Sequence, residues 1–350
     1  MTELTRRKLL GAFCALPVAA GLSMIASALP QPDLLPLKSG YTRRLKKILS
    51  AGNLPYIDIE SSCNSSQVNI DSIARSLDEL NIGLMALSAD LGQNQFRRGE
   101  RFDKLSERLM AKYPDRFIPV GNGAQPPAFT EAPGEFLDAH ERSADRLLLL
   151  GEFEFRHYPS PRQLGRAQFE RDVAVAIDGP SGERVFALSE KTGLAFQIHY
   201  EIEDELLAPL ERMLAQHPNA KVIWCHLAQV RYAERASRYT PVYVEGLLKR
   251  FPNLYFDTAF GDAGSVYPLS GQRHARVWAE DGNLKSEWRD LIVAQPSRFL
   301  SALDLGQDRL FRIVEYDNSH RNFLARLPED ARHQVAYRSA WSLLFGEDFA

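Results

Sequence analysis

One phrase recurs along this chain and restricts the folds that it can adopt: a segment with helical periodicity ends at a proline, and a short apolar run follows. Proline cannot continue a helix and biases the residue before it toward extended geometry, so it marks a boundary before a strand. The apolar runs are continuous rather than alternating, as expected for strands that are covered on both faces of a sheet. The four copies are Pro114 before Phe117–Val120, Pro218 before Lys221–Cys225, Pro252 before Leu254–Phe256, and Pro296 before Phe299–Leu303.

Counting all such runs gives eight predicted strands, and segments with helical periodicity such as Leu206–Leu214 lie between most of them. Eight alternating strand and helix units favour an α/β fold of the (β/α)8 TIM-barrel type, with a single domain, over an open doubly wound sheet. No glycine-rich nucleotide-binding motif follows any predicted strand. The predicted strands are Tyr56–Ile59, Ile82–Leu87, Phe117–Val120, Leu147–Phe155, Ala195–His199, Lys221–Cys225, Leu254–Phe256 and Phe299–Leu303.

The amino terminus has the pattern of an export signal rather than of a folded element. The pair Arg6-Arg7 precedes the apolar run Gly11–Ala28, which ends in the small residues Ala26-Ser27-Ala28, as in a twin-arginine signal. We expect cleavage near Leu29 and a periplasmic or otherwise exported mature protein. The alternative is a retained membrane anchor, because the run approaches the roughly 20 residues needed to span a bilayer. The chain is therefore divided into residues 1–28 (signal), 29–52 (lead-in) and 53–350 (barrel).

Charge and cysteine content narrow the class of partner. The chain has 42 Lys and Arg against 45 Asp and Glu, which gives no electrostatic reason to bind nucleic acid, so we expect none as a partner. No second apolar stretch reaches spanning length, so we expect no stable membrane insertion after signal removal. The partner expected for a barrel of this kind is a small-molecule substrate. The oligomeric state is left open. Cys63 and Cys225 remain once Cys14 leaves with the signal, and an exported compartment permits a disulfide between them without requiring one. Cys225 directly precedes a histidine and is interpreted as a core residue.

Polar side chains follow the predicted strands, at the end of a TIM barrel where active sites form. Two imidazoles and several carboxylates at one mouth could hold zinc or manganese, or could work as a metal-free acid/base cluster. His199 and His226 end consecutive strands, which favours a functional role for both, whereas His140, His217, His274 and His333 are expected to be solvated. The strand-end residues are Asp58, Glu60, Ser88, Asp90, Asn122, Glu152, Glu154, His199, His226, Asp257 and Asp304.

Most of residues 55–346 resemble the amidohydrolase-related TIM-barrel hydrolases, a group that includes aminocarboxymuconate-semialdehyde decarboxylase-like enzymes and lactonases, and the resemblance is strong from the predicted strand Ala195–His199 onward. The resemblance lies in Lys221–Leu227, Leu247–Asp257, Pro296–Asp304 and the closing segment Ala336–Gly346. It implies a metal-dependent hydrolase in which His199 and Asp304 bind the metal and His226 takes part in the chemistry.

The first strand departs from this family pattern. The family has a His-x-His pair there, and Glu60 and Ser62 occupy the two positions in this chain. A carboxylate can replace an imidazole as a ligand, but a neutral hydroxyl is a poor one. The resemblance therefore implies a site of Glu60, His199 and Asp304 that binds zinc, or manganese, more weakly than relatives with both histidines.

The predicted activity is hydrolysis of a small organic acid, lactone or amide by metal-activated water. In this scheme Asp304 takes the proton of the water and His226 polarises the carbonyl oxygen. The predicted substrate-binding residues are Glu152, Arg156, His157 and Asp257, of which Asp257 could instead be a helix cap. The alternatives are a non-oxidative decarboxylase and a metal-free, catalytically degenerate barrel that binds a ligand or a partner.

Overall fold

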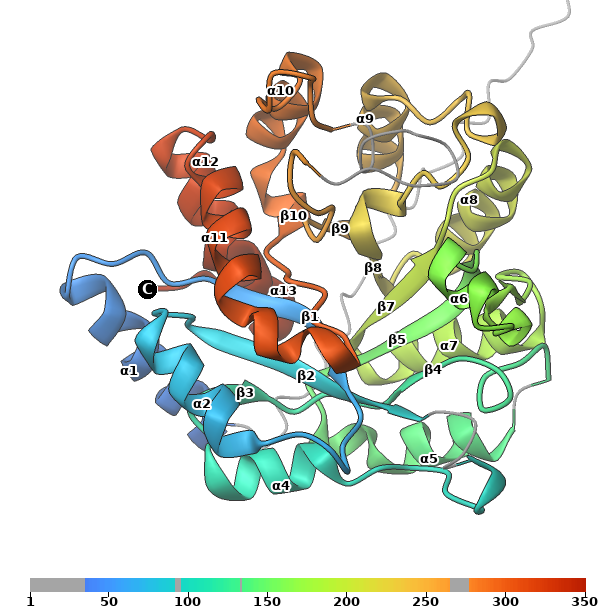
Figure 1. Cartoon of the computed structure of the whole chain (residues 1–350), viewed down its shortest axis with the longest axis horizontal. Coiled ribbons are helices and arrows are strands. Elements are labelled where there is room, and N and C mark those ends of the chain that lie inside the picture. The colour runs from blue at the N-terminus through green and yellow to red at the C-terminus, as the bar shows by residue number, and fades with distance from the viewer. Residues whose placement is uncertain (1–34, 92–95, 133, 265–276) are drawn as a thin grey trace, which may run out of the picture.

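The computed structural model describes residues 35–91, 96–132, 134–264 and 277–350, and it confirms the predicted single-domain (β/α)8 barrel (Figure 1). The sheet order is β1-β2-β4-β5-β7-β8-β9-β10, and the ladders between these neighbours are parallel. Two short strands lie off this path: β3 pairs with β2, and β6 runs antiparallel to β5. The signal at residues 1–28, its cleavage position and His274 lie outside the described residues.

All eight predicted strands are present. Two of them, β1 and β2, extend three or more residues beyond the apolar run, because polar residues that face the barrel mouth remain in the ladder. The strands are β1 (Ile57–Cys63), β2 (Leu84–Leu91), β3 (Phe117–Ile118), β4 (Gly123–Ala124), β5 (Leu149–His157), β6 (Val173–Ala174), β7 (Ala195–Tyr200), β8 (Lys221–Trp224), β9 (Leu254–Asp257) and β10 (Phe299–Leu300).

The barrel closes between β10 and β1 through single contacts rather than through a long ladder. The Ile59 amide donates to the Ser301 carbonyl at 3.0 Å, and a parallel bridge joins Ser61 to Leu305. The buried carboxylate of Asp58 accepts the Leu303 amide at 2.9 Å and the Ser61 hydroxyl at 2.7 Å. Asp58, predicted only as a strand-end polar residue, thus ties the first strand to the chain after the last one.

Helices surround the sheet, and the four that precede the repeated prolines end as predicted, within two residues of each proline. In α8 the buried positions Leu207, Leu210 and Leu214 follow helical spacing and pack toward the strands. The longer helices are α1 (Leu35–Ser50), α2 (Ile70–Glu79), α4 (Leu105–Lys112), α5 (Glu135–Ser143), α7 (Pro180–Thr192), α8 (Leu207–Gln216), α9 (Pro241–Arg250), α10 (Ser286–Ala294) and α11 (Ile313–Leu324). The shorter ones are α6 (Pro161–Gly165), α12 (Glu329–His333) and α13 (Ser339–Phe345).

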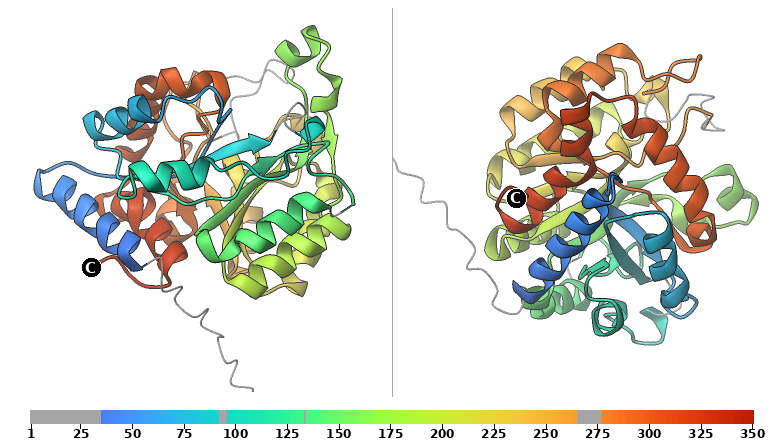
Figure 2. Two further views of the ribbon diagram at one scale, coloured as in Figure 1. Left: turned by 90° about the horizontal axis from the view of Figure 1, so that it is seen from below. Right: turned by 90° about the vertical axis from the view of Figure 1, so that its left-hand side faces the viewer.

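The lead-in segment 29–52 contains α1, which the sequence reading left without structure. Figure 2 shows α1 beside the carboxyl-terminal helices, where the Tyr41 ring contacts Phe345. The Tyr41 hydroxyl donates to the Phe117 carbonyl, and Arg44 donates to the Gly83 carbonyl at 2.7 Å. The helix α1 therefore packs on the barrel.

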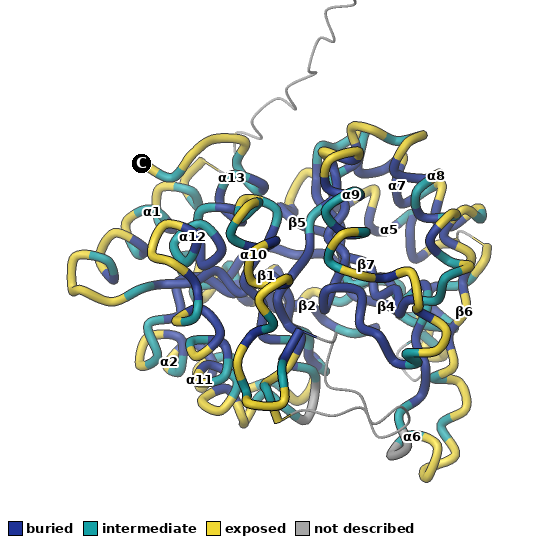
Figure 3. Tube along the Cα trace, turned by 90° about the horizontal axis from the view of Figure 1, so that it is seen from above, coloured by how far each residue is buried: buried dark blue, intermediate teal, exposed yellow. Residues whose placement is uncertain are grey.

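The strands and the inward faces of the helices form one continuous core (Figure 3). Cys63 and Cys225 are both buried free thiols, which confirms Cys225 as a core residue. His140 is fully buried, so its expected solvation is wrong: its ring bonds the carbonyl oxygens of Phe136 and Asn122. No helix among residues 35–350 that the structure describes has the length and apolarity to cross a bilayer.

Candidate active site

The carboxylate of Glu152 lies between the two histidines that end β7 and the strand after it. Its Oε1 atom is 3.2 Å from His199 Nδ1 and 3.2 Å from His226 Nε2. The imidazole rings of the two histidines are 5.0 Å apart. The structure therefore brings together His199 and His226, as the strand-end reading predicts, and joins them through a residue that was assigned to substrate binding.

Burial and the neighbouring charges shift the pKa values of this group in opposite directions, and the neighbouring charges dominate. Burial lowers the pKa of His199, but the charge of Glu152 and hydrogen bonds to Glu152 and Glu201 raise it to about 10. Burial also lowers the pKa of His226, and the charges of Asp304, Glu152 and Asp257 raise it to about 10. The two imidazoles in turn outweigh the burial of Glu152 and hold its pKa well below the ordinary value.

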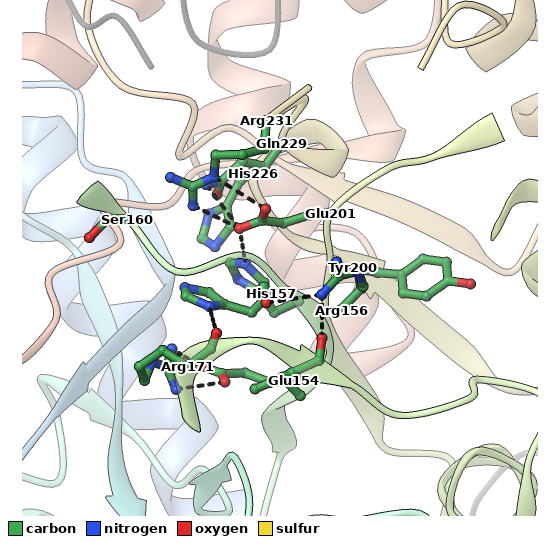
Figure 4. Close-up of polar contacts among 12 residues, drawn as sticks. Glu154, Arg156, His157, Ser160, Arg171, Tyr200, Glu201, His226, Gln229 and Arg231 are labelled. Atoms are coloured by element: carbon green, nitrogen blue, oxygen red, sulfur yellow. Dashed lines mark hydrogen bonds and ion pairs between the residues drawn. The ribbon is translucent and has the colours of Figure 1, made fainter. Parts of the chain in front are cut away.

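On one side, this group continues into a second buried ion pair that the sequence reading missed (Figure 4). His199 Nε2 lies 3.2 Å from Glu201, and Arg231 binds Glu201 through two nitrogens at 2.7 and 3.2 Å. Burial raises the pKa of the fully buried Glu201, but His199 and Arg231 outweigh it and lower the pKa to about 2. The signal was available, because residues two apart on an extended segment face the same side, as His199 and Glu201 do.

On the other side, His226 meets Glu60 and Asp257 at the base of the mouth. One ligand atom from each of these three buried residues lies within 4.8 Å of the other two. Among the described residues, Glu60 Oε2, His226 Nδ1 and Asp257 Oδ2 are buried and have no hydrogen-bond partner. Burial raises the pKa of Glu60 well above its ordinary value and also raises that of Asp257.

The backbone after β8 fixes the direction of the His226 ring. His226 has a φ of 59° and begins a run of left-handed residues that continues to Gln229. Asp257 Oδ1 accepts the amides of His226 at 2.7 Å and Ala259 at 3.0 Å. Asp257 thus binds the backbone after both strands and also lies beside the site. Non-glycine residues at positive φ, such as His226, are strained, and such strain concentrates at functional sites.

Buried acceptor atoms without partners are costly, and a divalent cation can satisfy several of them at once. Two carboxylates and an imidazole are donors that zinc and manganese accept. The residues at the base of the mouth therefore fit a divalent metal. Two further candidate groups in the described part of the chain are Glu152/His199/His226 and His157/His199/Glu201.

The predicted set of Glu60, His199 and Asp304 does not occur as one ligand group among the described residues. Asp304 binds Arg309 through both carboxylate oxygens, at 2.7 and 3.1 Å, and its amide donates to the Glu60 carbonyl at 3.0 Å. The Ser62 hydroxyl donates to Asp90 at 2.8 Å. The metal-binding role of the predicted set stays a prediction.

Arg156 and His157 lie at the end of β5, on the side of the Glu201–Arg231 ion pair (Figure 4). The Arg156 guanidinium stacks 3.4 Å from the Tyr158 ring centroid and donates to Asp172 at 2.7 Å. His157 Nδ1 lies 2.7 Å from the Arg171 carbonyl, and burial, the largest influence, lowers the pKa of His157 to about 4. Contacts within the protein therefore hold both side chains, and their predicted role as substrate anchors stays a prediction.

A cavity of about 150 Å³ lies between the chain after β9, the chain after β10, and α11. Asp304 and Arg309 form part of its wall, together with Phe260, Tyr316 and His320. The cavity is large enough for a small organic molecule. Asp304 belongs to its wall and also contacts Glu60 at the mouth.

Comparison with known proteins places this geometry in a family context. A family model described as "Amidohydrolase" matches residues 71–280, which is more than half of the chain. A solved 2,6-dihydroxybenzoate decarboxylase, in complex with 2,6-dihydroxybenzoate, has 15% sequence identity and a TM-score of 0.51, over 83% of this chain and 99% of that chain. A 2,6-dihydroxybenzoate decarboxylase from Rhizobium has 14% identity and a TM-score of 0.50, over 83% and 98%. Such identities show a shared fold alone. No curated protein matches the chain.

Proposed function

Because the chain belongs to the amidohydrolase family, we propose that it is a metal-dependent hydrolase acting on a small organic acid, lactone or amide. The observation that carries the proposal is the Glu152 carboxylate, held between His199 and His226 at the barrel mouth. Two imidazoles oriented by one carboxylate form an arrangement suited to acid/base chemistry.

The metal requirement is supported by the donors at the base of the mouth. Glu60 and His226 carry buried atoms without partners and would be among the residues that hold a divalent ion. A bound zinc or manganese ion would supply Lewis acidity and a more acidic water.

The protein's own groups provide proton transfer and charge stabilisation. His226 Nε2 and His199 Nδ1 both lie 3.2 Å from the same oxygen of Glu152. Glu152 fixes the orientation of both rings, so the imidazoles are already in place for proton transfer when a substrate binds. Asp304 is proposed as the proton acceptor at the mouth, once its carboxylate parts from Arg309.

The cavity beside Asp304 supports a small, acidic substrate. Its volume of about 150 Å³ limits the size of the ligand, and Arg309 already holds a carboxylate there, that of Asp304. A forked guanidinium binds carboxylates through two parallel hydrogen bonds. Arg309 can therefore exchange Asp304 for the carboxylate of a substrate.

The test is hydrolysis of a panel of lactones and amides by protein loaded with zinc or manganese. Glu152→Gln should reduce kcat by about 100-fold or more, the usual contribution of general acid/base groups. Glu154→Gln is the matched control on the same strand, since Glu154 pairs with Arg171 instead. If loaded wild type turns over no compound on the panel, the metal-free ligand-binding alternative replaces this proposal.

Decarboxylation is the second candidate, supported by the 2,6-dihydroxybenzoate decarboxylases that share the fold. The same imidazoles could protonate a carbanion left by loss of carbon dioxide. Release of carbon dioxide from 2,6-dihydroxybenzoate, with no hydrolysis of the panel, would select this reaction.

Export is the remaining part of the proposal. It is supported by Arg6-Arg7 and by the apolar run that ends at Ala28. Sequencing the amino terminus of the exported form should give a start near Leu29. An intact Met1 on a membrane-bound protein would make the segment an anchor instead.

A further inference from the structure

Three side chains at the base of the mouth each have a buried polar atom without a hydrogen-bond partner, and two of them, Asp257 and His226, are held in place through their other polar atom. Asp257 Oδ1 accepts two backbone amides, while Asp257 Oδ2 is buried and unpaired. His226 Nε2 faces Glu152, while His226 Nδ1 is buried and unpaired. Glu60 Oε2 completes the set. The atoms in use hold the orientation of Asp257 and His226, so the unpaired atoms are pre-positioned.

These three residues do not satisfy one another. His226 Nδ1 lies 3.9 Å from Asp257 Oδ1, which is too long for a hydrogen bond. All three residues are at most 4% exposed, so bulk water does not reach them. A proton on any one of them would leave the other unpaired acceptors unsatisfied, whereas one cation between them would satisfy all three.

The family-derived ligand set lacks such free atoms. Both ring nitrogens of His199 are occupied, by Glu152 and by Glu201. Both carboxylate oxygens of Asp304 bind Arg309. Of the three ligands predicted from the resemblance, only Glu60 has a buried atom left to coordinate a metal.

We propose that this chain binds its divalent cation through Glu60, His226 and Asp257, and that Asp257 takes the ligand position that the family pattern gives to Asp304. This inference rests on the proposed metal dependence and deepens it. Two carboxylate oxygens and one imidazole nitrogen suit zinc or manganese and leave at least one position for water or substrate. Glu152 then orients His226 through its second nitrogen, as carboxylates do for metal-binding histidines.

The experiment measures affinity rather than activity. Metal-stripped full-length protein is titrated with zinc, and separately with manganese, against a competing chelator. Asp257→Asn should weaken binding by about tenfold or more, because a charged ligand is lost, and losses of about 10-fold to 100-fold follow even from removing an outer partner. The asparagine oxygen can still accept hydrogen bonds from the backbone amides of His226 and Ala259, so the contacts that Asp257 Oδ1 makes with the backbone are preserved.

Asp304→Asn is the matched control, because it removes a carboxylate of the same size from the same mouth. Its zinc affinity should change by much less than about tenfold, because Asp304 acts on His226 through its charge while both of its oxygens are bound to Arg309. Thermal unfolding of both metal-free variants checks that each is folded. If Asp257→Asn proves unfolded, anomalous diffraction at the zinc edge from wild-type crystals decides the site: a peak among Glu60, His226 and Asp257 supports the proposal.

The outcomes separate this inference from the proposed function. If zinc binding depends on Asp257 but the protein neither hydrolyses nor decarboxylates its test substrates, the cation site is supported and the proposed enzymatic activity is rejected. Turnover by protein whose zinc affinity depends on Asp304 and not on Asp257 keeps the enzyme and overturns the site. Wild type that binds neither zinc nor manganese overturns the site as well.

Discussion

The two sides of the His199–Glu152–His226 group differ in how completely their charges are matched. On the outer side, Arg231 and His199 both contact Glu201, and the acid has no exposed surface. On the inner side, Glu60 and Asp257 are equally buried but have atoms without partners. The outer side is complete within the protein, whereas the inner side requires something from outside. This difference indicates that the outer pair holds the histidines in place and the inner residues bind a ligand.

The largest expected effect comes from breaking the outer side. Arg231→Met leaves Glu201 as a buried charge beside His199 alone, and losing one partner of a buried ion pair typically costs about 3–5 kcal/mol. The free energy of unfolding in urea should fall by about that amount. The double variant Arg231→Met with Glu201→Gln should recover most of the loss, because no uncompensated charge remains. A single variant as stable as wild type would show that the outer side is not what holds the group together.

A smaller effect is expected from filling the inner side. A cation that binds only the folded protein stabilises it by about 2.7 kcal/mol at a free concentration 100 times its Kd. Zinc should therefore raise the melting temperature of stripped wild type, and Asp257→Asn, with affinity weaker by about tenfold or more, should lose about half of that gain or more at the same zinc concentration. Arg231→Met, compared with its own metal-free form, should keep a gain. Equal gains in wild type and Asp257→Asn would erase the proposed contrast between the two sides.

The difference between the sides also shows what sequence reasoning could reach. The eight strands and the four helix ends followed from local signals, namely apolar runs and prolines. The proximity of His199 and His226 followed from the barrel, because parallel strands end at one mouth. Glu201 could have been predicted as a site residue, because side chains two apart on an extended segment face the same side. It was missed because the apolar run that defined the predicted strand ended at His199.

The inner side could not be predicted from pattern. Its geometry depends on left-handed backbone at His226 and at Asp304, and neither position carries the glycine that would signal such a conformation. The pairing of Asp304 with Arg309 depends on the turn after β10, and Arg309 lies outside the segments on which the family resemblance was recognised. Local patterns placed the residues at the mouth, and tertiary contacts decided which atoms remained free.

The smallest expected effect, a change in slope, compares the pH dependence of the two sides in metal-stripped protein. The pKa of Glu201 falls from 4.5 to about 2 on folding, so its stabilisation is present above pH 4.5 and is lost as the pH falls toward 2. The pKa of Glu60 is raised on folding, so its contribution is complete below pH 4.5 and is lost as the pH rises above that value. The two carboxylates should therefore give opposite slopes, each at most about 1.4 kcal/mol per pH unit.

Urea unfolding across a pH series, with a chelator present, measures both slopes. Glu201→Gln should reduce the slope of the free energy of unfolding against pH between about pH 2 and 4.5. Glu60→Gln should become more stable relative to wild type as the pH rises above 4.5. Glu201→Gln also removes the carboxylate that binds Arg231, which should lower the stability by a similar amount at every pH. Comparing slopes rather than absolute stabilities removes this contribution. Saturating zinc should reverse the slope at Glu60 alone, because a metal ligand must be deprotonated to bind. If zinc instead changes the slope that belongs to Glu201, the cation binds on the outer side, beside His157 and His199, and the assignment of the two sides is inverted.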